Sequence, residues 1–291
     1  MIRAGSFIFA ALAGAAVLAA GSANAQQLVQ KPQPKFPCGV GFVHNTHPLL
    51  HRAGFRLADV TADQVRLTFI GHASFDLRSP QGVRAVTDYN DNYPPRTPPD
   101  IATMNINRGN HSSYSVDPGV KHVLRGWDTG TGLPRHDIRL KDVRVYNIPT
   151  NISNFGGRVT NDSSIFVFQM GGLCIAHMGH MRHALNAEQL QAMGRIDVVL
   201  MPVDRRVTQS IEEILHNLGE LKPRVIIPMH FFSMGLAMEF TERVKDRYAV
   251  RLLDATSIDV RRDKLPVNTE VWLMRPIAGF FGGGGGFGGD F

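Results

Sequence analysis

The chain has 291 residues, of which 43% are hydrophobic and 19% charged, with 2 Cys, 12 His and a formal net charge of +6. This composition excludes a disordered polymer, a collagen-like fibre and a disulfide scaffold, because apolar residues are ample and cysteines are scarce. The basic residues are dispersed rather than gathered into runs interleaved with aromatic residues, so no nucleic-acid partner is expected.

Residues 1–25 have the pattern of a secretory signal peptide. Arg3 precedes an apolar run from Phe7 to Ala20, and the sequence Ala23-Asn24-Ala25 forms a cleavage site. The apolar run is too short for a stable bilayer anchor, and no other segment predicts a transmembrane helix. We therefore expect a periplasmic or secreted protein whose mature form has no transmembrane anchor.

The two cysteines allow two interpretations. In an oxidising compartment Cys38 and Cys174 could form a disulfide. Cys174 also lies in the apolar run 173–176, where a lone cysteine is usually a small core residue. The sequence leaves both open.

The first half of the chain predicts an irregular arm followed by strands. Residues 26–60 are rich in Pro, Gln and His and have no clear periodicity. Short β-branched or apolar runs then predict strands at 65–70, 73–77, 83–87 and 101–104. Four prolines predict a loop over 90–99, and residues 112–140 also have the composition of a long loop.

The second half alternates predicted strands and helices. Helices are expected from Asn186 and around 235–247, and strands are expected over 143–148, 165–169, 173–176, 197–201, 224–229, near 250–260 and over 270–274. The strongest helix signal is a capping box of Ser210 and Glu213, with Gly219 and Pro223 at the end of the helix. This order predicts two sheets covered by helices within one domain, followed by a flexible Gly/Phe-rich tail over 277–291.

Polar clusters follow four of the predicted strands directly. They are Asn105 to His111, Thr150-Asn151, His177 to His183, and His230. Clusters at the same edge of successive strands would converge, and imidazoles from separate strands commonly hold Zn²⁺. A single histidine at a strand end is more often a hydrogen-bonded surface or core residue. The recurrence of the clusters therefore carries the prediction of a metal site.

Taken in order, six segments resemble the landmarks of the metallo-β-lactamase superfamily, and most closely its branch of sugar-phosphate lactonases and N-acyl-phospholipid phospholipases. The segments are Phe69 to Phe75, Val83 to Asp88, Asn105 to His111, His177 to His180, Met201 to Val203 and Ile226 to His230. The resemblance implies an α/β fold, an αββα four-layer sandwich over residues 61–276. It also implies a small-molecule ester, lactone or phosphodiester substrate, hydrolysed through a metal-bound water.

The chain departs from the family at the ligand positions. Asn105, Asn107 and Asn110 stand within the family's H-x-H-x-D-H motif, which has one inserted residue here. Asn151 falls near an expected histidine, and His180 replaces the aspartate that bridges two ions. Asparagine is a weak ligand, so we expect one divalent ion, Zn²⁺, rather than two. The predicted ligands are His111, His180, His230 and Asn107.

Other residues are expected to support the ligands or line the groove, namely Asp88, Asn110, Asn151, His177 and Arg205. A second ligand set of His177, His180 and His183 has a spacing of three residues, but Gly179 favours a loop, so His180 is the preferred ligand. Arg205 would meet an anionic substrate group, or else form a surface ion pair. His72, in a tight turn, reads as structural.

Two functions remain open at this point. One is an exported metal-dependent hydrolase with a remodelled site. The other is a non-catalytic binding protein of the same fold with a degenerate metal site. The replacements are mostly asparagine, which still forms hydrogen bonds, and this pattern favours remodelling. Nothing in the sequence indicates the oligomeric state.

Overall fold

The computed structural model describes residue 38 and residues 63–153, 159–204 and 207–277, without the side chains of 151–153 and 159–161. The predicted signal peptide, and the predicted arm and tail apart from Cys38 and Ile277, lie outside the described residues. None of the helices within these ranges is both long and apolar enough to cross a membrane.

One sheet has six strands and is built mainly from the first half of the chain. Its order is β13 (Ser257–Arg261), β1 (Gln64–Gly71), β2 (Ser74–Arg78), β3 (Arg84–Val86), β4 (Ile101–Met104) and β5 (His122–Arg125). Strands β1 and β2 form an antiparallel hairpin, whereas β3, β4 and β5 run parallel. This sheet therefore carries the turns that follow β1, β3 and β4 toward the site.

The other sheet has eight strands. Its order is β12 (Ala249–Leu252), β14 (Glu270–Leu273), β11 (Val225–Met229), β10 (Val198–Pro202), β9 (Leu173–His177), β8 (Val159–Met170), β7 (Val143–Ser153) and β6 (Asp137–Leu140). Strands β9, β10 and β11 are parallel, so their carboxyl ends lie at one edge.

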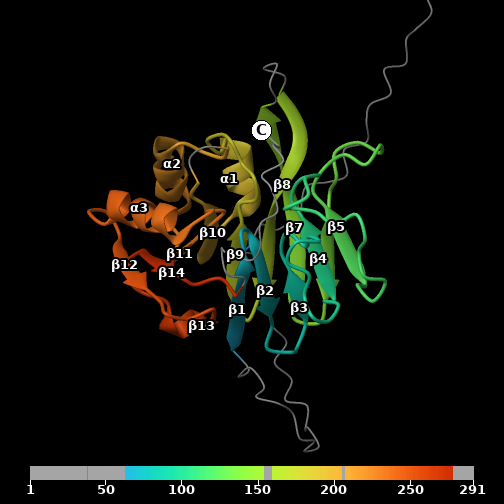
Figure 1. Cartoon of the computed structure of the whole chain (residues 1–291), viewed down its shortest axis with the longest axis horizontal. Helices are drawn as coiled ribbons and strands as arrows, with labels where there is room; N and C mark the ends of the chain where they lie inside the picture. Colours follow the sequence, from blue (N-terminus) through green and yellow to red (C-terminus); the bar gives the residue numbers. More distant parts are fainter. Residues whose placement is uncertain (1–37, 39–62, 154–158, 205–206, 278–291) are drawn as a thin grey trace, which may run out of the picture. The chain divides into compact units, whose positions relative to one another are not determined.

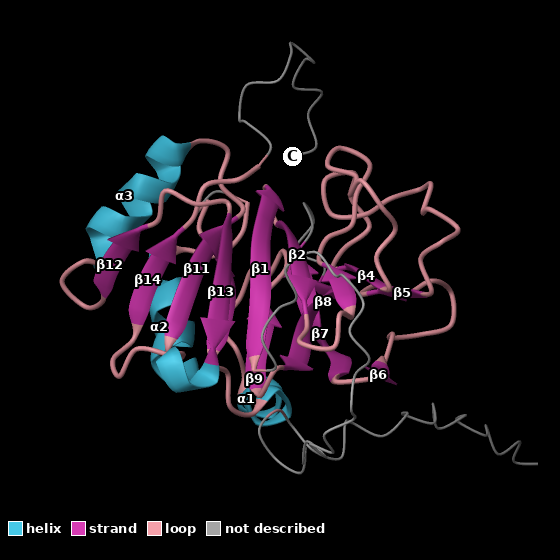
Figure 2. Ribbon diagram, turned by 90° about the horizontal axis from the view of Figure 1, so that it is seen from below, coloured by secondary structure: helices cyan, strands magenta, loops and turns pink. Residues whose placement is uncertain are grey.

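Three α-helices belong to the eight-stranded sheet. Helix α1 (Ala187–Met193) joins β9 to β10, α2 (Ile211–Leu221) joins β10 to β11, and α3 (Met234–Val244) follows β11; a short 3₁₀ helix, η1 (Arg262–Lys264), follows β13. Figure 1 shows the helices on one face of this sheet, and Figure 2 shows the β1–β2 hairpin in front of it.

The hydrophobic core lies between the two sheets. Strand β1 alternates between half-buried and buried residues, while β9, β10 and β11 are buried along their whole length. This contrast is expected, because a parallel strand covered on both faces is apolar throughout. Phe69 and Phe75 stack across the hairpin with ring centroids 4.6 Å apart. The core thus fixes the hairpin turn that carries part of the site.

The predicted α/β sandwich is confirmed in its two mixed sheets and their helices. The capping box of Ser210 and Glu213 is also confirmed at the start of α2. The helix continues through Gly219 to Leu221, so Gly219 was wrongly predicted to end it. The left-handed Lys222 forms the C-cap instead.

The predicted loop over 112–140 was wrong in two places, since it contains β5 and β6. Both strands are short and lie at the edge of a sheet, and neither has a fully buried face. Their polar composition is typical of edge strands, which explains why no apolar run marks them.

The two cysteines form a disulfide between Cys38 and Cys174, with their Cα atoms 5.9 Å apart. Both are buried. The Cys38 amide donates to the Tyr146 hydroxyl, which in turn donates to the carbonyl of Met193. The disulfide therefore ties the segment before β1 to β9, the strand that leads to His180.

Candidate metal centre

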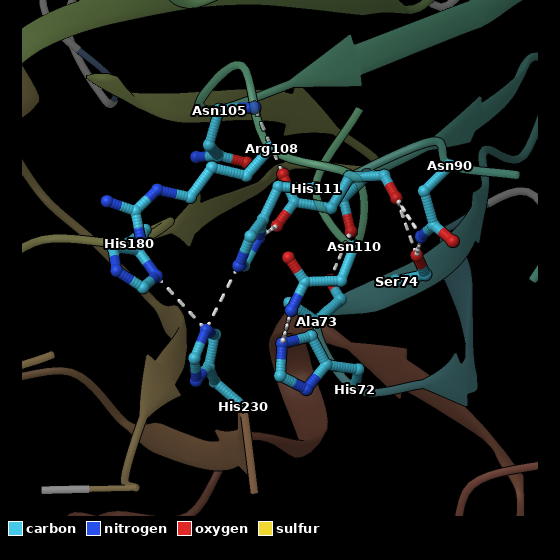
Figure 3. Close-up of polar contacts among 12 residues, drawn as sticks. His72, Ala73, Ser74, Asn90, Asn105, Arg108, Asn110, His111, His180 and His230 are labelled. Carbon is cyan, nitrogen blue, oxygen red and sulfur yellow. Dashed lines mark hydrogen bonds and ion pairs between the residues drawn. The ribbon is translucent and has the colours of Figure 1, made fainter. Parts of the chain in front are cut away.

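Four histidines meet where strands of the two sheets end. His72 lies in the turn after β1, His111 in the loop after β4, His180 after β9 and His230 after β11. All four are at most 6% exposed. Figure 3 shows the rings of His111, His180 and His230 pointing toward one another, with His72 beside them. Both sheets therefore contribute to one buried cluster of imidazoles.

The ring nitrogen Nε2 of His230 is the centre of this cluster. It lies 3.0 Å from Nε2 of His111 and 3.1 Å from Nδ1 of His180. Nitrogens bound to one tetrahedral Zn²⁺ at about 2.0–2.1 Å are separated by about 3.3 Å. Both observed separations are close to that value, so Nε2 of His230 is spaced to share one ion with either of the other two rings.

Two buried carboxylates stand behind the rings. Asp88 Oδ2 lies 2.6 Å from Nδ1 of His111, and Asp204 Oδ2 lies 3.5 Å from Nδ1 of His230. The second distance is longer than an ordinary hydrogen bond, so that contact is mainly electrostatic. An ionised carboxylate only accepts, so with Asp88 and Asp204 in their ionised forms the hydrogens of both histidines are assigned to Nδ1.

This assignment leaves bare lone pairs on Nε2 of His111 and His230, which face each other across 3.0 Å. Two lone pairs at this distance repel unless a proton or a cation lies close to both. A carboxylate behind a ligating histidine is also the usual arrangement around protein-bound zinc. The donor set therefore fits a divalent cation.

Burial lowers the pKa of His72, His111 and His180 well below 6.5, and the mutual repulsion of the imidazoles adds to the effect. Neutral rings are the form that binds metal. Burial raises the pKa of Asp88 to about 7, against the opposing influence of His177. Burial would likewise raise the pKa of Asp204, but His230 and Thr208 hold it below its ordinary value.

These shifts predict that the metal-free protein loses stability below about pH 6.5. Histidines with depressed pKa values in the folded state bind protons only after unfolding, so acid favours the unfolded chain. Each such proton contributes up to about 1.4 kcal/mol per pH unit. Asp88 has the opposite effect on stability, because its pKa is higher in the folded state than in the unfolded state. Between about pH 4 and 7 the proton that the folded protein holds on Asp88 offsets the destabilising effect of one of the three histidines.

Urea unfolding of the metal-free protein at pH 7.5 and 5.5 measures this effect. The exposed His216 provides a matched control, since His216→Ala should keep the same pH dependence. Equal free energies of unfolding at both pH values would show that the histidines titrate normally.

The backbone around the site adopts unusual conformations. His72, Asp88 and His230 have positive φ angles of 51°, 42° and 57°, which is uncommon for residues other than glycine and concentrates at functional sites. Gly179 has φ 64°, and a Cβ atom there would clash with the side chain of Asn105. Glycine at 179 therefore allows the chain to place His180 beside the cluster.

The structure brings His111, His180 and His230 together, and these were predicted as ligands. Asn107, the fourth predicted ligand, is exposed, whereas the histidines are buried. Asn105 is buried, and its Nδ2 donates to the carbonyl of Ser164, so its amide nitrogen is used by the fold.

The residues that were predicted to support the ligands or line the groove have different contacts in the structure. Asp88 contacts His111 as described, and Asn110 lies 3.1 Å from Nε2 of His72. His177 is buried and donates from Nε2 to the carbonyl of Ala73. His183 is half-buried and contacts the carbonyl of its neighbour, residue 184. The side chain of Asn151 and the whole of Arg205 lie outside the described residues.

Sequence reasoning missed three residues at the site. His72 was assigned a structural role, yet a nitrogen of His72 lies within 4.8 Å of nitrogens of His111 and His230. Arg182 has Nη2 3.4 Å from Nε2 of His180. Arg108 lies beside His180 in Figure 3. Its positive charge lowers the pKa of His111, His180 and Arg182, although burial is the larger cause for each of them. The position of each residue at a strand end was the available signal.

Similar proteins share this fold. A protein of Thermoplasma acidophilum named as a metal-dependent hydrolase is 25% identical over 203 residues, which is 63% of this chain and 90% of that protein. A Pyrococcus abyssi protein of the same name is 22% identical over 198 residues, which is 57% of this chain and 84% of the relative.

Among solved structures, a candidate Zn-dependent hydrolase of the metallo-β-lactamase superfamily from Thermotoga maritima has a TM-score of 0.53 and 23% identity. The match covers 72% of this chain and 98% of that one. A candidate metal-dependent hydrolase from Parabacteroides distasonis also has a TM-score of 0.53, with 13% identity and coverage of 72% and 92%. These likenesses show the fold. Residues 66–230 match the family model of the beta-lactamase superfamily domain, and the chain therefore belongs to that superfamily.

Proposed function

We propose that the protein is a metal-dependent hydrolase that uses a single divalent ion, Zn²⁺. The observation that carries the proposal is the convergence of Nε2 of His111 and His230, each with a buried carboxylate behind it. Its relatives are named as metal-dependent hydrolases. Nitrogen donors favour Zn²⁺ over Mg²⁺ or Ca²⁺, which prefer oxygen.

When bound, the ion would supply an activated water and polarise the bond that is cleaved. The chain's own residues have distinct roles around it. His111, His180 and His230 would bind the ion, while Asp88 and Asp204 hold the first and last of these rings in orientation. Burial excludes bulk water from the cluster, which strengthens the electrostatic interactions inside it.

The substrate class that best fits the site is a small ester, lactone or phosphodiester with an anionic group. Arg108 and Arg182 both lie near His180. They are also close to each other, because the charge of Arg108 lowers the pKa of Arg182. Two like charges beside a buried cluster create a positive potential that attracts anions. Asp204 offsets this charge for Arg182 only in part.

Replacing Arg108 with alanine should raise KM for an anionic substrate by about 10-fold or more, because a charge-assisted hydrogen bond contributes about 1.5–3 kcal/mol. The measurement compares a carboxylate-bearing ester with its neutral analogue. The exposed Arg96 supplies the control, and Arg96→Ala should leave both KM values unchanged. An equal rise for both esters would argue against charge recognition.

The activity itself is tested on the mature chain from Gln26. Protein supplemented with Zn²⁺ is analysed for bound metal and assayed against ester, lactone and phosphodiester panels. About one ion per chain together with turnover that a chelator abolishes is the expected result. Stoichiometric metal without turnover on any panel would favour the alternative, a non-catalytic binding protein. Absence of bound metal would overturn the proposed centre.

We also propose that the protein is exported to the periplasm or secreted. The support is the disulfide between Cys38 and Cys174, since structural disulfides persist in oxidising compartments and are rare in the cytosol. The signal-peptide pattern of residues 1–25 agrees with this. Fractionation of cells that express the full chain tests it, with the mature protein expected outside the cytoplasm.

A further inference from the structure

We propose that His72 supplies a ligand nitrogen to the metal ion, together with His111 and His230. Nitrogens of these three buried histidines lie within 4.8 Å of one another. Two nitrogens bound to one tetrahedral ion are about 3.3 Å apart, so the rings need to close by up to about 1.5 Å. The inference rests on the proposed metal centre and adds a ligand outside the motif that suggested it.

His72 is mechanically coupled to His230. The backbone carbonyl of His72 accepts a hydrogen bond of 2.7 Å from the amide of His230, and the centroids of their rings are 4.1 Å apart. Both residues have positive φ angles. The turn after β1 and the loop after β11 are therefore joined at the residues whose rings face the site, and the strain of both turns is borne there.

Asn110 can set the hydrogen position of His72 as the carboxylates do for the other rings. Its nitrogen Nδ2 lies 3.1 Å from Nε2 of His72, and in this orientation Nε2 accepts and the hydrogen of His72 lies on Nδ1. An amide, unlike a guanidinium, can turn by 180° and present its oxygen instead. With the amide turned, the hydrogen of His72 would be held on Nε2 and the lone pair of Nδ1 would become available to a cation.

His180 is less well prepared for ligation at Nδ1, the nitrogen that faces His230. Arg182 Nη2, which can only donate, lies 3.4 Å from the opposite nitrogen, Nε2. This contact favours a lone pair on Nε2 and a hydrogen on Nδ1. For Nδ1 to bind a cation, the hydrogen of His180 would have to lie on Nε2 instead, where it would point at the guanidinium of Arg182. His72 faces no such donor-only group among its contacts within the described residues, where its neighbour is Asn110.

The test is a titration of the metal-free, full mature chain with Co²⁺, whose visible absorption depends on the ligands around it. Three variants are compared with the wild type. His72→Ala removes the ring, His72→Phe keeps a ring of similar volume without nitrogen, and His216→Ala removes an exposed histidine as the control. Circular dichroism of the metal-free proteins checks that each variant folds.

Both His72 variants should bind Co²⁺ at least 10-fold more weakly, on the order of the loss seen when residues around a metal ligand are changed. Their visible spectra should also differ from that of the wild type. Free imidazole should restore the spectrum of His72→Ala by entering the vacated space, but not that of His72→Phe. His216→Ala should match the wild type.

The outcomes separate this inference from the proposed function. Wild-type affinity and spectrum in both His72 variants would overturn the role of His72 and leave the metal centre intact. Failure of the wild type itself to bind Co²⁺ or Zn²⁺ would overturn the metal centre. If His72→Ala does not fold, the ring-preserving His72→Phe decides the question.

Discussion

Replacing His230 with alanine should abolish metal binding and hydrolysis together. Nε2 of His230 lies 3.0 Å from His111 and 3.1 Å from His180, so this ring is the shared neighbour of both. Changes to residues that merely support ligands cost about 10–100-fold in metal affinity. Loss of the shared ligand should therefore exceed about 100-fold, measured as Zn²⁺ affinity by competition with a chelator of known strength.

Two comparisons make the His230 result specific. His216→Ala removes an exposed imidazole from α2 and should retain wild-type affinity and turnover. Asp204→Asn leaves His230 in place and weakens only the charge 3.5 Å behind it, so it should show an intermediate loss. Full Zn²⁺ affinity in His230→Ala would place the ion elsewhere and contradict the proposed centre.

The ordering of these effects follows from burial. His230 is 1% exposed and Asp204 also 1%, so removal of the imidazole leaves a buried carboxylate that keeps its hydrogen bonds from Thr208 and the amide of Val207 but loses the group that balances its charge. A buried charge that loses its charge partner is destabilising by itself. Thermal unfolding of metal-free His230→Ala is therefore needed alongside the binding data, because a lower melting temperature alone is expected and does not report on ligation.

The sequence predicted the part of the site that strand ends determine. His230 follows β11 directly, while His180 and His111 lie in the polar clusters after β9 and β4, and parallel strands deliver their carboxyl ends to one edge of each sheet. Their convergence follows from topology once the strands are recognised. A supporting role for Asp88 was also predicted, but its contact with His111 was not; the adjacent, parallel strands β3 and β4 bring the two residues together.

The remainder depends on contacts that no local pattern contains. His72 looked structural because a histidine in a tight hairpin turn has an ordinary explanation. Its proximity to His230 arises only when a turn of one sheet meets a loop of the other. Asn105 looked like a replaced ligand, but its amide is used in a hydrogen bond to Ser164. Side-chain direction, rather than sequence position, decides such cases.

Removing the disulfide should have the largest effect on stability of any change considered. Cys38 and Cys174 are 136 residues apart in the chain, so the cross-link restricts a long loop in the unfolded state. Loop-entropy arguments place the stabilisation near the upper end of the usual range, about 2–5 kcal/mol. The variant Cys38→Ala/Cys174→Ala should lose free energy of unfolding by that amount, measured by urea denaturation.

The reduced wild type is the matched control, because it loses the cross-link and keeps both sulfur atoms. It is prepared by unfolding in reductant, since both cysteines are buried, and then refolded. The reduced protein and the double-alanine variant should share a steeper urea dependence than the oxidised protein, because an unrestricted chain exposes more surface on unfolding. Equal midpoints in all three would mean that packing around β9, and not the cross-link, holds Cys38 in place.

A large loss in the free energy of unfolding would instead mean that the protein needs an oxidising compartment for full stability. The proposed export would then have a physical reason that is independent of the signal-peptide pattern.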